Sequence, residues 1–196
     1  MINDIGVLAW GVCGLEAESV FFGIPVTLRV PEVVGVKLTG ALQSGVMATD
    51  LALTVTEMLR KLDLQDRYVE FFGPGVSTLT AGDRAVVANM TPEFGGNSGY
   101  FPIDAETLKY LEMTGRSRDH VAFVKAHAKR TGLWFDPHID PRYTATVELE
   151  LSTVEVSLAG PARPQGRIPA GATLRAMKLI SLPCEGRRMP TRSDSR

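Results

Sequence analysis

The sequence predicts an α/β fold in which strands and helices alternate. Two β-branched or apolar runs, at 33–38 and 68–72, are each followed by a segment with helical spacing or helix-capping residues. The run at 68–72 is almost continuously apolar, which is typical of a strand buried on both faces. Such alternation is typical of layered α/β proteins, although it leaves the order of the strands open.

The first elements follow from local signals. A helix is expected over 15–22, because Gly23 stands where a C-cap glycine would. The alternating residues 26–30 predict a strand, and the β-branched run 33–38 predicts a second one. Thr49 or Asp50 is expected to cap the next helix, since apolar residues then recur at helical spacing, at Leu51, Val55, Met58 or Leu59, and Leu62.

In the second half, polar capping residues mark three helix starts and glycines follow two helix ends. The predicted elements are helices from Thr80 to Asn89, from Asp104 to Gly115 and from Ser117 to Arg130, and a strand over 146–151.

Composition restricts the class of protein. The chain has 196 residues, of which 44% are hydrophobic, so it can bury a core. A net charge of −1 gives no whole-chain electrostatic case for nucleic acid or a membrane surface, and we expect neither partner. No apolar run has membrane-spanning length, and no secretory signal pattern is present. Cys13 and Cys184 form no Cys-x-x-Cys, which favours a reducing, cytoplasmic setting.

Charge divides the chain into two parts. Residues 166–196 carry seven Lys and Arg against two acidic residues, a net of +5, which leaves −6 for residues 1–165. The segment is rich in Gly, Pro, Arg and Ser and shows little periodicity. We therefore expect an α/β segment over 1–165 and a divergent, basic, disordered tail over 166–196. A basic arm for nucleic acid is the alternative, and composition favours the tail.

A polar pair marks the strongest candidate site. Asn89 and Glu93 lie four residues apart, where a predicted helix gives way to glycine-rich backbone. Residues at i and i+4 share a helix face, so both groups can point at one spot. Pro92 discourages regular helix there, and the glycines allow close approach of a ligand. From the residues alone, a backbone cap and a surface acid remain the alternative.

Other polar residues give weaker signals. His120 and His127 share a basic helix, which indicates a solvated face. Asp136, His138 and Asp140 could hold a metal, but a Pro-bounded acidic loop of this kind is more typical of a turn.

The segment 11–14 lacks a full G-x-G-x-x-G pattern and a preceding strand, so a nucleotide loop is not expected. Cys13 has no histidine near it in sequence, so a buried structural thiol is the expected state.

Ordered motifs along 1–165 resemble the aconitase family, in its aconitase A type. They occupy residues 6–18, 30–40, 48–56, 71–76, 88–104, 110–116, 151–155 and 159–165. The resemblance implies an incomplete, layered α/β/α aconitase-type domain. In that family an Asp-Ser-His-Thr motif lies shortly before the point that matches Met1, and three cluster-binding cysteines lie beyond the resemblance. Aconitases usually have glycine where Cys13 stands, so a side chain there is expected to crowd its surroundings.

The resemblance also implies chemistry. Aconitases interconvert the tricarboxylic acids citrate and isocitrate through cis-aconitate on a [4Fe-4S] cluster. The residue matching Asn89 hydrogen-bonds the water or hydroxide on the catalytic iron, and the residue matching Glu93 supports a catalytic histidine.

These implications define the expected function: a segment of an aconitate hydratase, a hydro-lyase. The Asp-Ser-His motif and the cluster cysteines are missing, so we expect no cluster held by this chain alone and no turnover without a complementing chain. Two alternatives remain open, a non-catalytic remnant or partner-binding domain and a segment of a 2-methylcitrate/2-methylisocitrate dehydratase. Some long aconitases bind RNA, but the acidic region 1–165 gives that activity no support.

Overall fold

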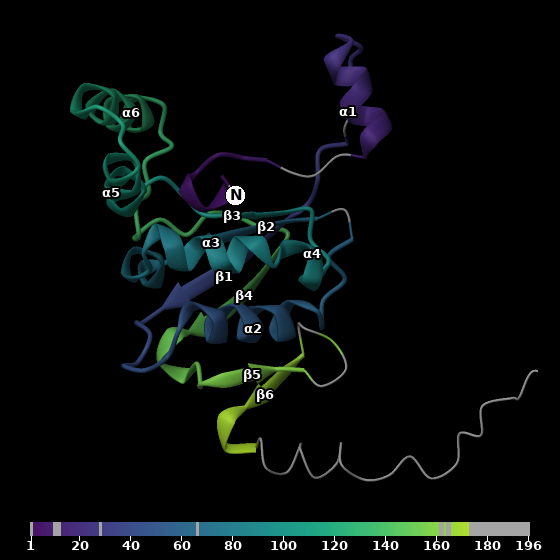
Figure 1. Ribbon diagram of the computed structural model, residues 1–196, viewed down its shortest axis with the longest axis vertical. Helices are drawn as coiled ribbons and strands as arrows, with labels where there is room; N and C mark the ends of the chain where they lie inside the picture. Colours follow the sequence, from purple (N-terminus) through teal and green to yellow (C-terminus); the bar gives the residue numbers. More distant parts are fainter. Residues whose placement is uncertain are drawn as a thin grey trace, which may run out of the picture.

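The computed structural model describes residues 2–9, 13–27, 29–65, 67–160, 163 and 166–172. Its centre is a four-stranded parallel sheet in the order β3-β2-β1-β4 (Figure 1). The strands are β1 (Val33–Thr39), β2 (Tyr68–Phe72), β3 (Ser98–Tyr100) and β4 (Ala145–Glu150). Helices occupy the connections between these strands, so the α/β prediction is confirmed.

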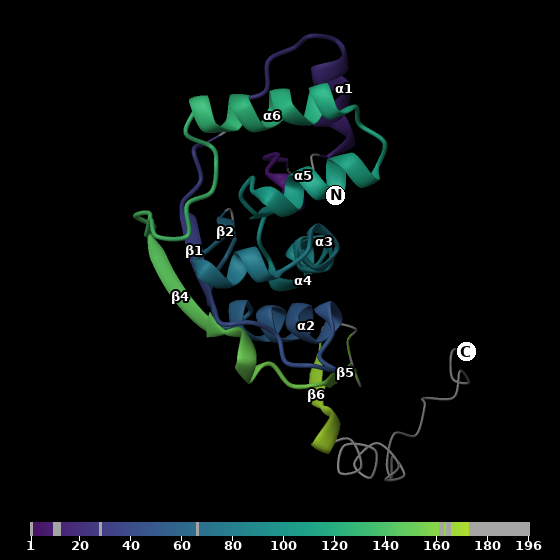
Figure 2. The same ribbon diagram turned by 90° about the vertical axis from the view of Figure 1, so that its left-hand side faces the viewer.

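Three helices cover one face of this sheet, namely α2 (Ala48–Leu59), α3 (Ala81–Asn89) and α4 (Thr91–Phe94) (Figure 2). Alternate residues of the strands point into the layer between sheet and helices, because successive side chains of a strand face opposite ways. In β1 these are Val34, Val36 and Leu38, each at most 1% exposed. Parallel register sets Val69 and Phe71 of β2 beside Val34 and Val36. The core is therefore the contact between sheet and helices.

The opposite face of the sheet is lined by larger and more polar residues. Gly35 leaves room there for the ring of Tyr143, since a Cβ at residue 35 would lie 2.2 Å from a ring carbon. The Tyr143 ring also packs against Phe72, with 5.0 Å between ring centroids. Lys37 Nζ lies 2.8 Å from Asp140 Oδ2 on the same face. The segment before β4 thus covers part of this face.

Two further helices, α5 (Ala105–Met113) and α6 (Arg118–Arg130), stand together beyond one end of the sheet (Figure 1). Ser117 Oγ accepts a hydrogen bond from the backbone N–H of His120, at 3.3 Å, and so caps α6. Gly115 follows α5 with φ of +86°, a left-handed conformation that favours glycine. The capping residues predicted both helices correctly.

A small hairpin closes the described chain. It consists of β5 (Ser157–Ala159) and β6 (Arg167–Pro169), which pair in antiparallel fashion. The first residues of the predicted tail, 166–172, therefore contain β6 and the short helix η4 (Ala170–Ala172), while 173–196 lie outside the described residues. Arg167 Nε lies 2.6 Å from Glu57 Oε2, which ties the hairpin to α2. The other short 3-10 helices are η1 (Asn3–Ile5), η2 (Pro74–Thr78) and η3 (Leu151–Thr153).

Two sequence predictions need correction. The described residues of 26–30, all but Leu28, form no strand, and Val30 is 89% exposed. Alternation alone does not make a strand, because a strand needs a neighbour to hydrogen-bond, and none of the described strands pairs with this segment. The second correction concerns α2, whose N-cap is Met47; Asp50 lies inside the first turn and accepts from the Met47 N–H at 2.7 Å.

The remaining helix, α1 (Gly14–Phe21), stands away from the body of the molecule in Figure 1, and none of its residues is buried. Gly23 follows it with φ of +71°, so the predicted helix and its glycine end are confirmed.

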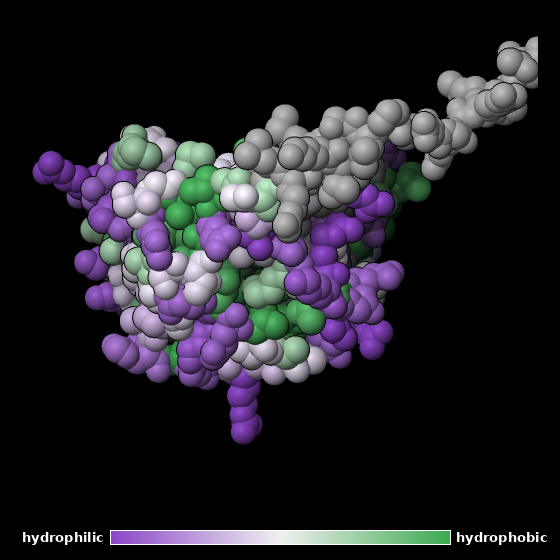
Figure 3. Space-filling model, turned by 90° about the horizontal axis from the view of Figure 1, so that it is seen from below, coloured by the Kyte–Doolittle hydropathy of each residue, from purple (hydrophilic) through white to green (hydrophobic). Residues whose placement is uncertain are grey.

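On the face drawn in Figure 3, apolar areas are interspersed with hydrophilic side chains. Among the described helices, none combines the length and the apolar character needed to span a bilayer.

Candidate functional site

The predicted site lies where α3 passes into α4. Helix α3 begins at Thr80, whose hydroxyl accepts from the Asp83 N–H at 3.2 Å while Asp83 Oδ2 accepts from the Thr80 N–H at 3.0 Å. This reciprocal capping box satisfies two backbone donors, and it confirms the start predicted from the sequence. The helix then runs to Asn89, where Met90 ends it.

Asn89 and Glu93 lie on either side of a break between two helices, and α3 ends at Asn89 as predicted. Asn89 is the exposed last residue of α3, and Glu93 is a partly buried residue of α4. The break occurs because Pro92 fits the first turn of a new helix, where its missing N–H costs nothing. Thr91 Oγ1 donates to the carbonyl of Ala88 at 2.7 Å and fixes the corner. The two predicted residues still flank one corner of the chain.

Glu93 carries the most informative atom of this corner. Its Oε2 is buried, and none of the described residues donates a hydrogen bond to it. The backbone carbonyl of Glu93, in contrast, accepts from Arg60 Nη1 at 2.6 Å. A buried carboxylate oxygen without a donor is costly, by about 1–3 kcal/mol or more. Within the described residues, Glu93 Oε2 is therefore a covered acceptor that lacks a donor.

The glycines after this corner serve internal packing. Gly95 ends α4 with φ of +87°. A Cβ at Gly99 would lie 2.5 Å from Thr91 Oγ1, so glycine is required for β3 to approach α4 this closely. The close approach in this structure is between two parts of the chain, and the predicted approach of a ligand stays a prediction.

A buried ion pair behind the corner was missed by sequence reasoning. Arg84 of α3 is 0% exposed, and its Nη1 and Nη2 lie 2.9 and 2.5 Å from the two carboxylate oxygens of Asp104. Nη2 also donates to the carbonyl of Val76 at 3.0 Å. The signal for this pair in the sequence is weak, namely a cation among the apolar residues of α3. This pair anchors the start of α5 to α3.

The first residues of the chain enter the same polar region. Asn3 Nδ2 donates to Ser98 Oγ at 3.2 Å, and the backbone N–H of Phe101 donates to the Asn3 carbonyl at 2.9 Å. Asp4 is 3% exposed, and burial raises the pKa of its carboxyl, while the Arg84 charge opposes the rise. The segment η1 is thus fixed against β3 and α3.

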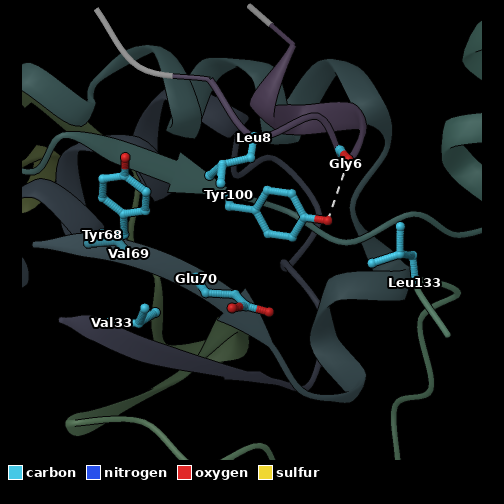
Figure 4. Close-up of a pocket in the computed structure, with 8 residues that line it drawn as sticks. All are labelled: Gly6, Leu8, Val33, Tyr68, Val69, Glu70, Tyr100 and Leu133. Carbon is cyan, nitrogen blue, oxygen red and sulfur yellow. Dashed lines mark hydrogen bonds between the residues drawn. The ribbon is translucent and has the colours of Figure 1, made fainter. Parts of the chain in front are cut away.

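A cavity of about 410 Å³ opens on the sheet face opposite the core (Figure 4). It is lined by Gly6, Leu8, Val33, Tyr68, Val69, Glu70, Tyr100 and Leu133. Glu70 is the only carboxylate in that lining, and it belongs to the central strand β2. Tyr100 closes one side, where its hydroxyl donates to the Gly6 carbonyl at 3.4 Å.

The ionisable groups around this cavity are coupled. Burial raises the pKa of Glu70, and burial together with the Glu70 charge raises the pKa of Tyr100. Burial and the same charge also raise the pKa of Tyr143, whose buried hydroxyl has no partner of ordinary hydrogen-bond geometry among the described residues. A partly buried carboxyl in a cavity wall can hold a proton or form an ion pair with a cation. Sequence reasoning missed Glu70 as a site residue, although a glutamate within the apolar run 68–72 was a usable signal.

The other predicted polar residues have local structural roles. Asp140 pairs with Lys37, and Asp136 Oδ1 accepts from the His138 N–H at 2.9 Å, as in a turn. His120 and His127 are exposed, as predicted for a solvated helix face. Within the part of the chain that the structure describes, no three His, Cys, Asp or Glu side chains lie close enough to hold a metal ion.

Cys13 is a free, exposed thiol at the start of α1, so the prediction of a buried thiol is wrong. The reason is the position of α1, which packs little of its surface on the body. The Cys13 φ of −71° is ordinary for any residue, and the expected crowding at this position is not observed.

Iron–sulfur clusters need several cysteine thiolates, and Cys13 is the one cysteine among the described residues.

Comparisons with known proteins support the family resemblance. The family model of the aconitase family (aconitate hydratase) matches residues 1–183. The chain is 52% identical over 176 residues to aconitate hydratase A of Salmonella typhimurium, which covers 90% of this chain and 20% of that protein. It is 53% identical over 168 residues to aconitate hydratase A of Escherichia coli, covering 86% of this chain and 19% of that protein.

A third relative, aconitate hydratase A of Staphylococcus aureus, is 54% identical over 169 residues, with 86% of this chain and 19% of that protein covered. The chain thus spans about a fifth of the length of these relatives. A family match over nearly the whole chain and identity near one half leave one conclusion: the chain belongs to the aconitase family.

Proposed function

We propose that this chain acts as a segment of an aconitate hydratase, contributing Asn89 and Glu93 to a site that other parts of the family's polypeptide complete. The reaction is the reversible dehydration and rehydration that links citrate and isocitrate through cis-aconitate. The tricarboxylic acid is the substrate of the completed site. A reducing, cytoplasmic setting belongs to the same proposal, because the two cysteines of the sequence form no Cys-x-x-Cys.

The observation that carries this proposal is the unpartnered Oε2 of Glu93. A carboxylate that accepts a ring N–H fixes the tautomer and raises the basicity of a histidine, and Glu93 has a buried oxygen free for that bond. The exposed amide of Asn89 at the same corner can both donate to and accept from an oxygen of a bound hydroxyl or carboxylate. The corner is therefore suited to orient a proton-transfer group and a substrate oxygen.

The proposal assigns the rest of the chemistry to other parts of an aconitate hydratase. When bound, a [4Fe-4S] cluster supplies Lewis-acid chemistry in this family. The described residues include one exposed cysteine, so the ligands of the cluster are proposed to come from elsewhere in the enzyme. The chain alone is then expected to hydrate no cis-aconitate, because its corner lacks both the electrophile and the imidazole.

The test is complementation with the two flanking parts of Escherichia coli aconitate hydratase A, prepared without the stretch that aligns with this chain. The purified parts are mixed with the chain, reconstituted with iron and sulfide under anaerobic conditions, and assayed for hydration of cis-aconitate. We expect activity in the mixture and none in either component. Glu93→Gln should reduce that activity at least a hundredfold, while Glu112→Gln, at an exposed position of α5, leaves it unchanged.

Assaying the same mixture with 2-methylcitrate-type substrates separates the related dehydratase from an aconitate hydratase. No activity with any of these substrates, despite a stable assembly, would leave a non-catalytic remnant as the function of the chain. Equal activity of mixtures that carry Glu93→Gln and Glu112→Gln would show that Glu93 does not belong to the site.

A further inference from the structure

The most unusual surface of this molecule is the outer side of α1. Its apolar members are Leu15, Val20, Phe21, Phe22 and Ile24, here called the α1 surface, with exposed fractions of 77, 59, 87, 80 and 56%. The burial pattern of α1 is inverted, because Leu15 and Phe21 are exposed while Glu16 is partly buried and accepts from the Cys13 N–H at 3.2 Å. A helix on the surface of a complete domain turns its apolar stripe toward the core.

The length of α1 strengthens this contrast. The helix has eight residues, and isolated helices shorter than about 12–15 residues are marginal in water, so tertiary packing must stabilise it. The described chain offers α1 no such packing, since none of its residues is buried. Contiguous apolar residues of this kind mark a surface made for contact with protein.

The comparisons show how much further polypeptide the relatives carry beyond the matched stretch. Relatives near 52% identity carry the matched stretch inside proteins about five times as long, and the family match includes every residue of α1. In those proteins about four-fifths of the polypeptide lies outside the stretch and is available to bury the helix. We propose that the α1 surface is the docking site of this chain for the remaining part of an aconitate hydratase polypeptide. This inference rests on the proposed function and names its partner.

The chemistry of the α1 surface describes its partner. Two adjacent phenylalanines and three branched aliphatic side chains require an apolar recess on the other side. Glu16 and Glu18 lie on the same helix near its N-terminus, so cationic groups should flank that recess. A second copy of this chain would bring two more glutamates to the same place, and like charges there oppose self-docking.

The experiment compares hydrogen exchange in the complete 196-residue chain, alone and mixed with the flanking parts of Escherichia coli aconitate hydratase A. We expect the amides of 14–21 to exchange at least tenfold more slowly in the mixture. The double variant Phe21→Ser, Phe22→Ser should bind those parts at least tenfold more weakly. The matched control is Ile139→Ser, because Ile139 is 59% exposed in the loop before β4 and lies outside the α1 surface.

Three results would overturn the inference: no association, association without protection of 14–21, or equal weakening by the double variant and by Ile139→Ser. A dimer of the chain that the double variant dissolves would assign the α1 surface to a second copy and likewise overturn it. The readouts do not depend on catalysis. Protection of 14–21 in an assembly without cis-aconitate hydration would keep the docking site and reject only the proposed function.

Discussion

The buried pair of Arg84 and Asp104 allows the most specific stability prediction. The substitution is Asp104→Ala. It removes both carboxylate oxygens from Arg84, which is 0% exposed, and it leaves that guanidinium with one acceptor among the described residues, the Val76 carbonyl at 3.0 Å. It also removes the cap of α5, since Asp104 Oδ1 accepts from the Glu106 N–H at 2.9 Å.

The expected magnitude follows from these two losses. Leaving one partner of a buried ion pair uncompensated costs about 3–5 kcal/mol. Losing a helix N-cap costs about 1 kcal/mol. Together they approach the lower end of the free energy of unfolding of small domains, about 5–15 kcal/mol. Asp83→Ala is the matched control, because Asp83 belongs to the capping box of α3 and faces no buried cation.

Urea unfolding followed by circular dichroism measures both variants against the wild-type chain. We expect Asp104→Ala to lower the free energy of unfolding by at least about 3 kcal/mol, or to prevent folding, and Asp83→Ala to lower it by about 1 kcal/mol. Equal losses for the two variants would refute the reasoning, because the buried charge would then carry no cost.

Three further predictions concern the sheet and the hairpin. Gly35→Ala should destabilise the chain by about 1–3 kcal/mol in urea unfolding, because its Cβ would lie 2.2 Å from the ring of Tyr143, whereas Gly82→Ala, whose nearest neighbour is 3.7 Å away, should be neutral or stabilising. Because burial raises the pKa of Glu70, its native carboxyl holds a proton more tightly than the unfolded one, so stability should fall as the pH rises from about 4.5 through the raised pKa. Glu70→Gln should flatten that pH dependence in a series of unfolding curves, and an unchanged slope would contradict the burial. Arg167→Ala should accelerate amide exchange in β6, because it removes the ion pair with α2, while exchange in β1 stays unchanged.

The parts of the fold that sequence predicted well are set by local interactions. Thr80 with Asp83 and Ser117 each bond backbone groups three residues away, so their residue types reveal the helix starts directly. Gly115 marks a helix end for an equally local reason, its positive φ.

The parts that sequence missed depend on contacts between distant segments. Arg84 meets Asp104 across 20 positions, and nothing local distinguishes it from a surface arginine. Cys13 was predicted to be a buried thiol because no histidine lies near it in sequence, yet it is exposed, and α1 has no partner surface among the described residues. The assignment of Asn89 and Glu93 to one site depends on family resemblance, and the structure adds the break at Pro92 and the unpartnered Glu93 oxygen.

The most direct test of the central proposal is the rate of cis-aconitate hydration after anaerobic reconstitution with iron and sulfide. It is measured on the chain alone and on the chain mixed with the flanking parts of Escherichia coli aconitate hydratase A. We expect no turnover alone and turnover in the mixture that Glu93→Gln abolishes. Two results would contradict the proposal that this chain is one contributing segment of an aconitate hydratase. One is turnover by the chain alone, and the other is a mixture whose activity is unchanged by Glu93→Gln.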